Sequence, residues 1–516
     1  MKSGGLKADL HVHSRSSTRP SEWILRKIGC AESYTYPLEL YRLAKERGMN
    51  LVTVTDHNTL AGSLEIAHLP DTFLSEEVTT YFPEDGCKLH VLVYNITEAQ
   101  HEDISRLREN VFDLAAYLNR EGIVHALAHP LYAVNEKLAV EHVEKALILF
   151  GIFELNGTRD GYQNETLRAI LTSLRKEDME MLCEKHNLVP LATRPWKKGI
   201  VGGSDDHSSL TVASTCTEVE GASSISDFLQ GVAQGRALVK GGASNPKVMA
   251  RNLYSIAYQF YRNRFGLERY VSRELLLRFI DRALVPGSGE AEGLVDRIRR
   301  AIVYRRSSAF FRSRPKTFRD LFEYEAREII LRDQGMSALV SSHGPVTPGT
   351  EKVWFRFVNQ IADGVMKQLA NSVLNGLSGA NLFDIFHTVG SAGSLYTMLA
   401  PYLVSYTLFK KDRRFCDQCR RHFLFNREEA PPNRILRVAH FTDTFHEVNG
   451  VALTLKKELE ISMKHELHHE ILTCGPEPDA PGVANFRPIG TYELPEYPDL
   501  KLCYPPLLKM LDYCYE

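Results

Sequence analysis

The sequence lacks the features that mark exported or strongly charged proteins. Its first residues, MKSGGLKADLHVH, contain no apolar segment of signal-peptide length, which predicts a cytoplasmic protein. Neither sign of charge dominates, because 62 Lys and Arg residues face 64 Asp and Glu residues. A chain this close to neutrality has no overall attraction to nucleic acid or to an anionic membrane, so either partner would need a local patch.

Cysteine is scarce, with nine among 516 residues. Their odd number and scattered positions favour reduced thiols over a disulfide framework. The one tight pair, Cys416 and Cys419 in RFCDQCRRHF, could be half of a zinc site. No second pair accompanies it and only His422 stands near, so two ordinary thiols on one helix turn are the favoured interpretation.

Long apolar runs are also rare. Residues 385–409 carry no Lys, Arg, Asp or Glu, which raises the question of a membrane span. Interruptions by Gly, Ser, Thr, Tyr and Pro401 favour a buried helical hairpin, with membrane-surface contact as a minor alternative. Residues 297–316 hold eight Lys or Arg and no acid. A solvated helix face is favoured there over weak contact with an anionic surface or a phosphate backbone.

The chain divides into three parts by pattern. In residues 1–245 short apolar runs alternate with helical patterns, which predicts a parallel α/β sheet or barrel with its chemistry at the carboxyl ends of the strands. Residues 250–430 show long helical patterns and predict a helical middle domain. An α/β pattern returns in residues 434–516 and predicts an incomplete Rossmann-like unit, since a doubly wound domain normally needs more chain.

Histidines and carboxylates gather near the predicted strand ends of residues 1–245. The motifs, in chain order, are H-x-H (His11, His13), T-D-H-N (Asp56, His57), E-V-T-T (Glu77), H-V-L (His90), A-H-P (His129) and G-S-D-D-H (Asp205, His207). His11 and His13 are two apart on a strand and share a face, so they can grip one ion together. A metal hydrolase needs such donors to converge, with a carboxylate to bridge the ions. The series as a whole predicts a metal site.

These motifs over residues 1 to about 245 resemble the PHP (polymerase and histidinol phosphatase) domains, which are distorted (β/α)7 barrels holding two or three divalent ions. The resemblance implies zinc, manganese or iron as the cofactor. It also implies that His11, His13, Glu77 and Asp205 bind a first ion, and that Glu77 bridges to a second one held by His90 and His129.

A third ion in that family uses the histidines that correspond to His57 and His207, plus one ligand soon after H-x-H. In this sequence the stretch is HSRSSTRPSEW, where Thr18 stands in place of the usual Asp or His. Glu22 is a substitute on proximity alone. This departure leaves the third ion open.

Two further assignments concern neighbouring carboxylates. Glu77-Val78-Thr79 fits the family's acidic-aliphatic-Ser/Thr pattern, so Glu77 is predicted to be the ligand and Glu76 to be solvated. The stretch FELNG suggests that Glu154 or Asn156 points at the same mouth, where a structural role is an equal alternative.

The resemblance implies a phosphoesterase in which a metal-bridging hydroxide attacks phosphorus, with His57, His207 and Asp205 as the catalytic residues. Arg15 and Arg19 could hold phosphate oxygens, and a place in a surface loop is the alternative. The expected substrate is a phosphorylated small molecule or a nucleotide. A non-enzymatic alternative is that the metal serves the fold only.

The stretch RVAHFTDTFHEVNGVALTLKKE in residues 434–516 resembles the start of family-4-like retaining glycosyltransferases of the GT-B type. The alternative function is therefore a fragment of a PHP–glycosyltransferase fusion, whose complete form transfers sugar from a nucleotide-sugar donor while the barrel is regulatory or structural. Transfer by this chain alone is not expected, because donor recognition in that family lies mostly in a second domain.

One zinc-protease motif, H-E-x-x-H, occurs at residues 465–469. It requires a helix, which places both histidines on one face one turn apart. The helical pattern ends near Lys464 and a strand pattern follows, so the protease interpretation is not favoured.

Overall fold

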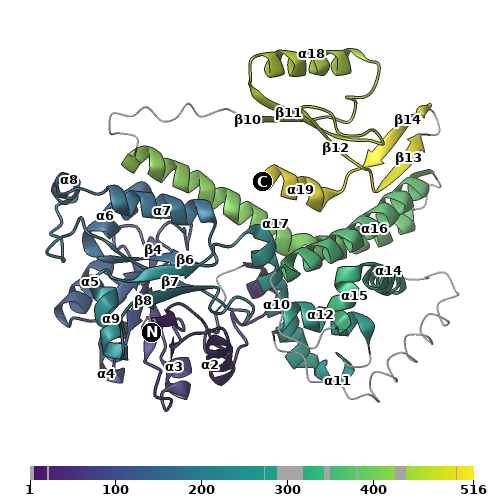
Figure 1. The fold of residues 1–516 in the computed structure, drawn as a ribbon. Coiled ribbons are helices and arrows are strands. Elements are labelled where there is room, and N and C mark those ends of the chain that lie inside the picture. The colour runs from purple at the N-terminus through teal and green to yellow at the C-terminus, as the bar shows by residue number, and fades with distance from the viewer. Residues whose placement is uncertain are drawn as a thin grey trace.

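The computed structural model describes residues 5–19, 23–271, 274–286, 318–341, 349–378, 382–424, 437–494 and 497–516. The basic segment 297–316 and Glu22 lie outside these residues. The described chain is a mixed α/β protein with helices and several sheets (Figure 1). The N-terminal sheets lie at the left of that view, the middle helices at the right, and the C-terminal unit at the top.

Two sheets are built from the described N-terminal strands. The strands are β1 (Leu6–Asp9), β2 (Leu51–Val52), β3 (Ser75–Tyr81), β4 (Lys88–Tyr94), β5 (Val124–Leu127), β6 (Ile152–Asn156), β7 (Gly199–Gly203), β8 (Thr215–Val219) and β9 (Leu238–Gly241). The order is β2-β1-β8-β9 in one sheet and β3-β4-β5-β6-β7 in the other. Isolated bridges between Val12 and Asp206, Val52 and Thr72, and His57 and Glu77 connect the two sheets.

Strand β4 departs from the parallel expectation, because it runs antiparallel to both β3 and β5. Only residues 82–87 separate β3 from β4, and the amide of Phe82 donates to the carbonyl of Cys87 at 2.9 Å. A turn this short cannot hold the crossover helix that a parallel pair needs. Consequently His90 reaches the site from the first half of β4, and Glu77 from within β3, rather than from strand ends.

Helices of the N-terminal region cover these sheets. They are α1 (Trp23–Ile28), α2 (Pro37–Glu46), α3 (Ala61–Ile66), α4 (Glu98–Leu107), α5 (Val111–Arg120), α6 (Val140–Leu149), α7 (Gly161–Ser173), α8 (Lys176–His186) and α9 (Ile225–Ala233). Val91, Val93, Leu114, Leu147 and Phe153 are fully or almost fully buried in the core between sheet and helices. Burial of such apolar side chains is the main force that holds the layers together.

The middle region is helical, as its sequence pattern predicts. Its helices are α10 (Pro246–Phe265), α11 (Glu268–Val271), α12 (Leu275–Leu284), α14 (Phe318–Arg332), α15 (Gln334–Ser341), α16 (Thr350–Ser378) and α17 (Leu382–Leu424). The rings of Phe279, Trp354 and Phe357 pack together in a separate core, which Tyr402 joins.

Helix α17 corrects the hairpin expected over residues 385–409, since the whole stretch lies within this one helix, with Pro401 inside it. No helix of the described residues is long and apolar enough to cross a membrane. The C-terminal half of α17 lies along the N-terminal region (Figure 1), where Cys416 and Cys419 are completely buried in its core. Burial raises the pKa of Cys419 to about 12, so these residues pack as neutral thiols.

The C-terminal unit has the parallel sheet β10-β11-β12 and a hairpin. Its elements are β10 (Arg437–Phe441), α18 (Gly450–Lys464), β11 (His468–Cys474), β12 (Val483–Phe486), β13 (Gly490–Leu494), β14 (Tyr497–Tyr504) and α19 (Leu507–Tyr515). Because α18 ends at Lys464 and His468 begins β11, the two histidines of the H-E-x-x-H motif do not share a helix. The expectation of a strand there is confirmed.

Candidate metal centre

Glu77 lies at the centre of a ring of histidines. Its Oε2 is 3.2 Å from the Nε2 atoms of both His11 and His13. Its Oε1 is 2.8 Å from Nδ1 of His90 and 3.1 Å from Nε2 of His129. The carboxylate is 1% exposed. One buried acid thus contacts four histidines from three separate segments.

Asp205 adds a second carboxylate beside the H-x-H pair. Its Oδ1 lies 3.4 Å from Nε2 of His11 and 3.6 Å from Nε2 of His13. Asp205 and His129 have φ values of +50° and +29°, which are strained for residues other than glycine and are typical of functional sites. Gly203 permits the close approach of β7 to the H-x-H segment, because a Cβ there would lie 2.3 Å from the Cβ of His11.

His57 and His207 form an outer group whose side chains are 20% and 19% exposed. Nδ1 of His57 is 3.0 Å from Oε2 of Glu77, and its Nε2 is 3.3 Å from Oε2 of Glu32. Nε2 of His207 is 3.7 Å from Oε1 of Glu32. Within this cluster, the described residues include three groups whose donor atoms are close enough to hold an ion: His11, His13 and Asp205; His57, Glu77 and His90; and His13, His57 and His207.

Glu32 lies beside His57 and His207, where the resemblance implies one further ligand from the chain soon after H-x-H. Thr18 is exposed instead. The loop that carries Glu32 is held against the H-x-H segment by the amide of Arg15, which donates to the carbonyl of Thr35 at 2.8 Å, and by the Ser33 hydroxyl, which donates to the carbonyl of His13 at 3.3 Å. Glu32 lies in no recognisable motif, so no sequence signal could have found it.

A second layer of polar groups orients the donors. Oε1 of Glu154 is 2.8 Å from Nδ1 of His11, and its Oε2 accepts from the amide of His129 at 2.9 Å. Asn156 donates to Oδ2 of Asp205 at 3.1 Å. Glu154 and Asn156 therefore both point at this mouth. A carboxylate on Nδ1 fixes the imidazole so that Nε2 is left for an ion.

Glu76 and Arg15 lie in surroundings that differ from those predicted from the sequence. Glu76 is not solvated; it is 1% exposed and lies 2.8 Å from Nδ1 of His101. Of the two arginines assigned to phosphate, Arg19 lines the cavity above the cluster, whereas Arg15 donates to Glu65 at 3.1 Å and is not among the residues that line the cavity.

The cluster keeps its carboxylates ionised. Burial alone would raise the pKa of Glu77, but His57, His11 and His90 outweigh it and hold the pKa well below its usual range. Against the same opposing effect of burial, His57 and His207 lower the pKa of Glu32 to about 2. Burial lowers the pKa of His90 to about 4, which keeps its imidazole neutral. Ionised carboxylates and neutral imidazoles are the forms that bind metal.

The donor set fits divalent ions. Among the described residues, buried Oε2 of Glu77, Nδ1 of His57 and Nε2 of His207 have no hydrogen-bond partner, although they face other polar atoms of the cluster. Despite burial, the surrounding carboxylates raise the pKa of His11 and His57 well above the usual value. The site therefore favours added positive charge, which a divalent ion would supply.

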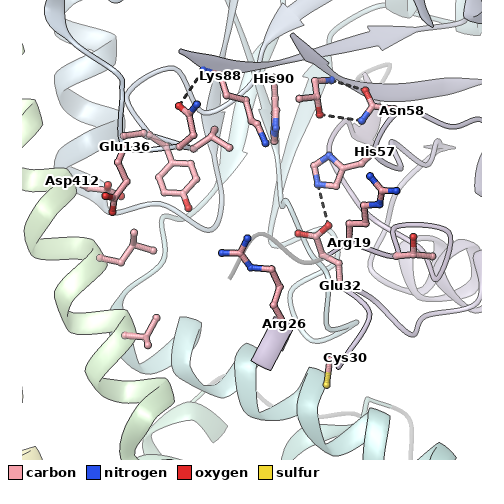
Figure 2. Close-up of a pocket in the computed structure, with 18 of the residues that line it drawn as sticks. Arg19, Arg26, Cys30, Glu32, His57, Asn58, Lys88, His90, Glu136 and Asp412 are labelled. Carbon is pink, nitrogen blue, oxygen red and sulfur yellow. Dashed lines mark hydrogen bonds and ion pairs between the residues drawn. The ribbon is translucent and has the colours of Figure 1, made fainter. Parts of the chain in front are cut away.

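A cavity of about 1430 Å³ opens above this cluster (Figure 2). Glu32, His57 and His90 lie on one side, and the guanidinium of Arg26 points into the open space from α1. Helix α17 forms the opposite side. The middle region thus contributes directly to the site, which its sequence did not indicate.

A second histidine–carboxylate cluster lies in the C-terminal unit, where the donor atoms of His440, Glu458 and His469 are within 4.8 Å of one another. His440 and Glu458 are exposed, and His469 is half-buried with its Nδ1 3.1 Å from the hydroxyl of Ser462. Two of these three donors are therefore exposed to solvent, whereas Glu77, His11 and His13 of the N-terminal cluster are buried.

Comparisons with known proteins give limited likenesses. No protein-family profile matches this sequence. The uncharacterized protein MJ1587 of Methanocaldococcus jannaschii is 36% identical over 73 residues, which are 14% of this chain and 41% of that protein. The likeness therefore spans less than half of that relative.

Solved structures resemble the chain only distantly. PsfC from Pseudomonas syringae is 14% identical over 50% of this chain and 99% of PsfC, with a TM-score of 0.30. A protein from Bifidobacterium adolescentis proposed to be a metal-dependent phosphoesterase is 15% identical, with a TM-score of 0.24. An amidohydrolase from Chromobacterium violaceum, solved with sulfate and no metal, is also 15% identical, with a TM-score of 0.23. Each of the last two matches covers 39% of this chain and 87% of the other protein.

Proposed function

We propose that this chain is a metal-dependent hydrolase of the PHP type, that strands β1–β7 are its distorted barrel, and that it hydrolyses phosphate esters. The single observation that carries the proposal is the buried carboxylate of Glu77, in contact with His11, His13, His90 and His129. A structural carboxylate needs one or two partners. A carboxylate surrounded by four imidazoles from three segments is what a multi-metal site requires.

The donors divide into two or three ion positions. His11, His13 and Asp205 would hold one ion, and Glu77 would connect it to a second one on His90 and His129. His57, His207 and Glu32 surround a third position. Imidazole and carboxylate donors suit zinc, manganese or iron. Such ions supply a water of lowered pKa and neutralise charge on the phosphate.

The protein's own groups carry the remaining steps. His57 lines the cavity and lies against Glu32, so its imidazole could deliver a proton to the leaving oxygen. His207 also lies against Glu32 and is the alternative donor. Asp205 is held by Asn156 and by the Thr158 hydroxyl at 3.0 Å, and so stays aimed at the H-x-H pair. Arg19 and Arg26 line the cavity and could hold phosphate oxygens. The substrate would be a phosphorylated small molecule or a nucleotide.

The test is metal analysis of the purified protein together with hydrolysis of a chromogenic phosphate ester before and after treatment with a chelator. We expect at least two equivalents of metal, chelator-sensitive hydrolysis, and loss of both in His11→Ala and His129→Ala. His68→Ala, an exposed histidine outside the cluster, is the matched control. Unchanged metal content and activity in the two cluster variants would show that the proposal is wrong.

The resemblance of residues 434–516 to glycosyltransferases supports a second candidate, in which the barrel serves a sugar transferase. In its favour, β10, α18 and β11 form a parallel strand–helix–strand unit, with Asn449 capping α18. Calorimetric titration with nucleotide sugars tests it. Binding that survives His11→Ala would favour this candidate for the C-terminal unit, and no binding would remove it.

A further inference from the structure

The cavity above the metal cluster has two chemically different walls. The wall from the N-terminal region is cationic and polar; its basic members are Arg19, Arg26, Lys88 and Arg108. The opposite wall is one face of α17, and its members are Tyr396, Leu403, Val404, Thr407, Leu408, Lys411 and Asp412. Figure 2 shows this helix across the open space from His57 and Glu32.

The α17 wall is a stripe along one face of the helix that is largely apolar from Tyr396 to Leu408 and ends in the charged residues Lys411 and Asp412. Tyr396, Leu403, Thr407 and Lys411 are spaced by seven, four and four residues, which places them on one face of the helix. From Tyr396 to Leu408 the stripe is about 18 Å long at a rise of about 1.5 Å per residue. Leu403, Val404 and Leu408 are only partly buried, so a bound molecule can contact them. The helix already buries Tyr402 and Tyr406 in the middle core on another face.

The acids of the described lining do not oppose an anionic ligand. Glu136 pairs with Lys411 at 2.6 Å, Asp412 approaches Arg159 at 3.9 Å, and Glu32 faces the outer histidines. The cations of the other wall and the ion positions therefore dominate the charge at the mouth. An anionic head suits that side, and an uncharged apolar body suits α17.

We propose that the substrate is an amphiphilic phosphate ester, whose phosphate lies over the histidines and whose apolar leaving group lies along α17. This inference rests on the proposed phosphoesterase function and names its substrate class. It gives the middle region a role as the specificity-determining wall. Covering the stripe with hydrocarbon removes apolar surface from water on both partners, which is favourable in proportion to the area covered.

Binding of n-alkylphosphonates tests the proposal without hydrolysis. The full chain, loaded with manganese, is titrated by calorimetry with ethyl-, butyl-, hexyl- and octylphosphonate. We expect affinity to rise about twofold to fourfold for each added methylene that contacts the wall. Leu408→Asn should at least halve this dependence on chain length and leave ethylphosphonate affinity unchanged. Leu453→Ser, at a 63% exposed leucine on α18, is the matched control and should behave as the parent protein.

A gain-of-affinity variant guards against loss of folding. Thr407→Leu extends the stripe, so octylphosphonate should bind about threefold more tightly with no change for ethylphosphonate. Affinity that is independent of chain length in the parent protein, or an unchanged slope in Leu408→Asn, would overturn the inference. If the protein hydrolyses short phosphate esters but its affinity for alkylphosphonates does not depend on chain length, this inference alone is wrong. A steep binding series without hydrolysis of any phosphate ester defeats the proposed function alone.

Discussion

Among the described residues, two histidine–carboxylate clusters have donor atoms close enough to hold a metal ion, and these two differ in how deeply their donors are buried. In the N-terminal cluster Glu77 is 1% exposed, and Oε1 of Glu154 lies 2.8 Å from Nδ1 of His11 and orients its ring. In the C-terminal cluster His440 and Glu458 are exposed. The one hydrogen bond that the described structure shows to a histidine of this cluster joins the hydroxyl of Ser462 to Nδ1 of His469.

The difference teaches that donor identity alone does not make a metal centre. Exposed donors keep their rotamer freedom and their hydration, so binding an ion must order and desolvate them. Donors that are buried and hydrogen-bonded to neighbouring groups are already ordered and desolvated in the folded protein, so ion binding does not have to order or desolvate them again. We therefore expect tightly bound metal in the first cluster and only weak binding in the second.

The largest effect should come from removing the central carboxylate. Glu77→Gln should release the metal and lower hydrolysis by about a thousandfold or more, because the change removes the bridging charge. Metal content after desalting and kcat/KM for a chromogenic ester measure it. Glu458→Gln, the equivalent change in the exposed cluster, should alter neither quantity. Equal losses in both variants would contradict the contrast.

A smaller loss of metal affinity is expected when a residue that contacts a ligand, and is not itself a ligand, is changed. Glu154→Gln keeps the shape but weakens the hold on His11, and should reduce metal affinity by about 10-fold to 100-fold. Competition with a fluorescent chelator measures the affinity. Ser462→Ala removes the corresponding hydrogen bond of the exposed cluster and serves as the control. Its affinity for the tightly bound metal should match that of the parent protein.

The outer position offers a milder change still. Glu32→Gln should lower occupancy of one ion only and reduce kcat/KM by about tenfold, since His57 and His207 remain. The stoichiometry comes from elemental analysis at low metal concentration. Thr18→Ala, at the exposed residue that sequence reasoning considered, should change nothing. A loss in Thr18→Ala equal to that of Glu32→Gln would argue against Glu32 as the ligand.

The contrast between buried and exposed carboxylates also extends to stability. Glu144 is 1% exposed and faces Lys185, His186 and His422 at 2.7 Å, so it joins α6 and α8 to the end of α17. Glu144→Gln should lower the free energy of unfolding by about 1–3 kcal/mol. Chemical denaturation at pH 7 measures it.

The pH dependence of that loss has a definite sign. Although burial acts in the opposite direction, Lys185, His186 and His422 hold the pKa of Glu144 below its usual value of 4.5. The stabilisation is therefore fully present above pH 4.5 and is lost as the pH falls through the lower folded pKa. The difference between parent and variant should shrink below pH 4.5. Glu136→Gln, which breaks an exposed ion pair, should show no such difference.

Much of the site was predictable because its residues sit in short motifs. The two-residue spacing predicts that His11 and His13 can bind one ion together. In the structure they lie just after β1 and not within it, and both contact Glu77 and Asp205. The sequence could not show that Glu76 is buried as well as Glu77. Both faces of β3 are buried, and the burial of Glu76 depends on His101 and the surrounding helices. The single helix α17 was missed because Gly, Ser and Pro401 weaken helix propensity locally, whereas packing on two cores compensates.

The sequence by itself determined the donor inventory, the alternation of strands and helices in the N-terminal region, and the end of α18 before β11. Each of these rests on local spacing, which a chain carries wherever it folds. Only the tertiary structure decided that Glu32 joins His57 and His207, and that α17 forms the far wall of the cavity. These features join residues far apart in the chain, so they depend on long-range packing that no short motif encodes.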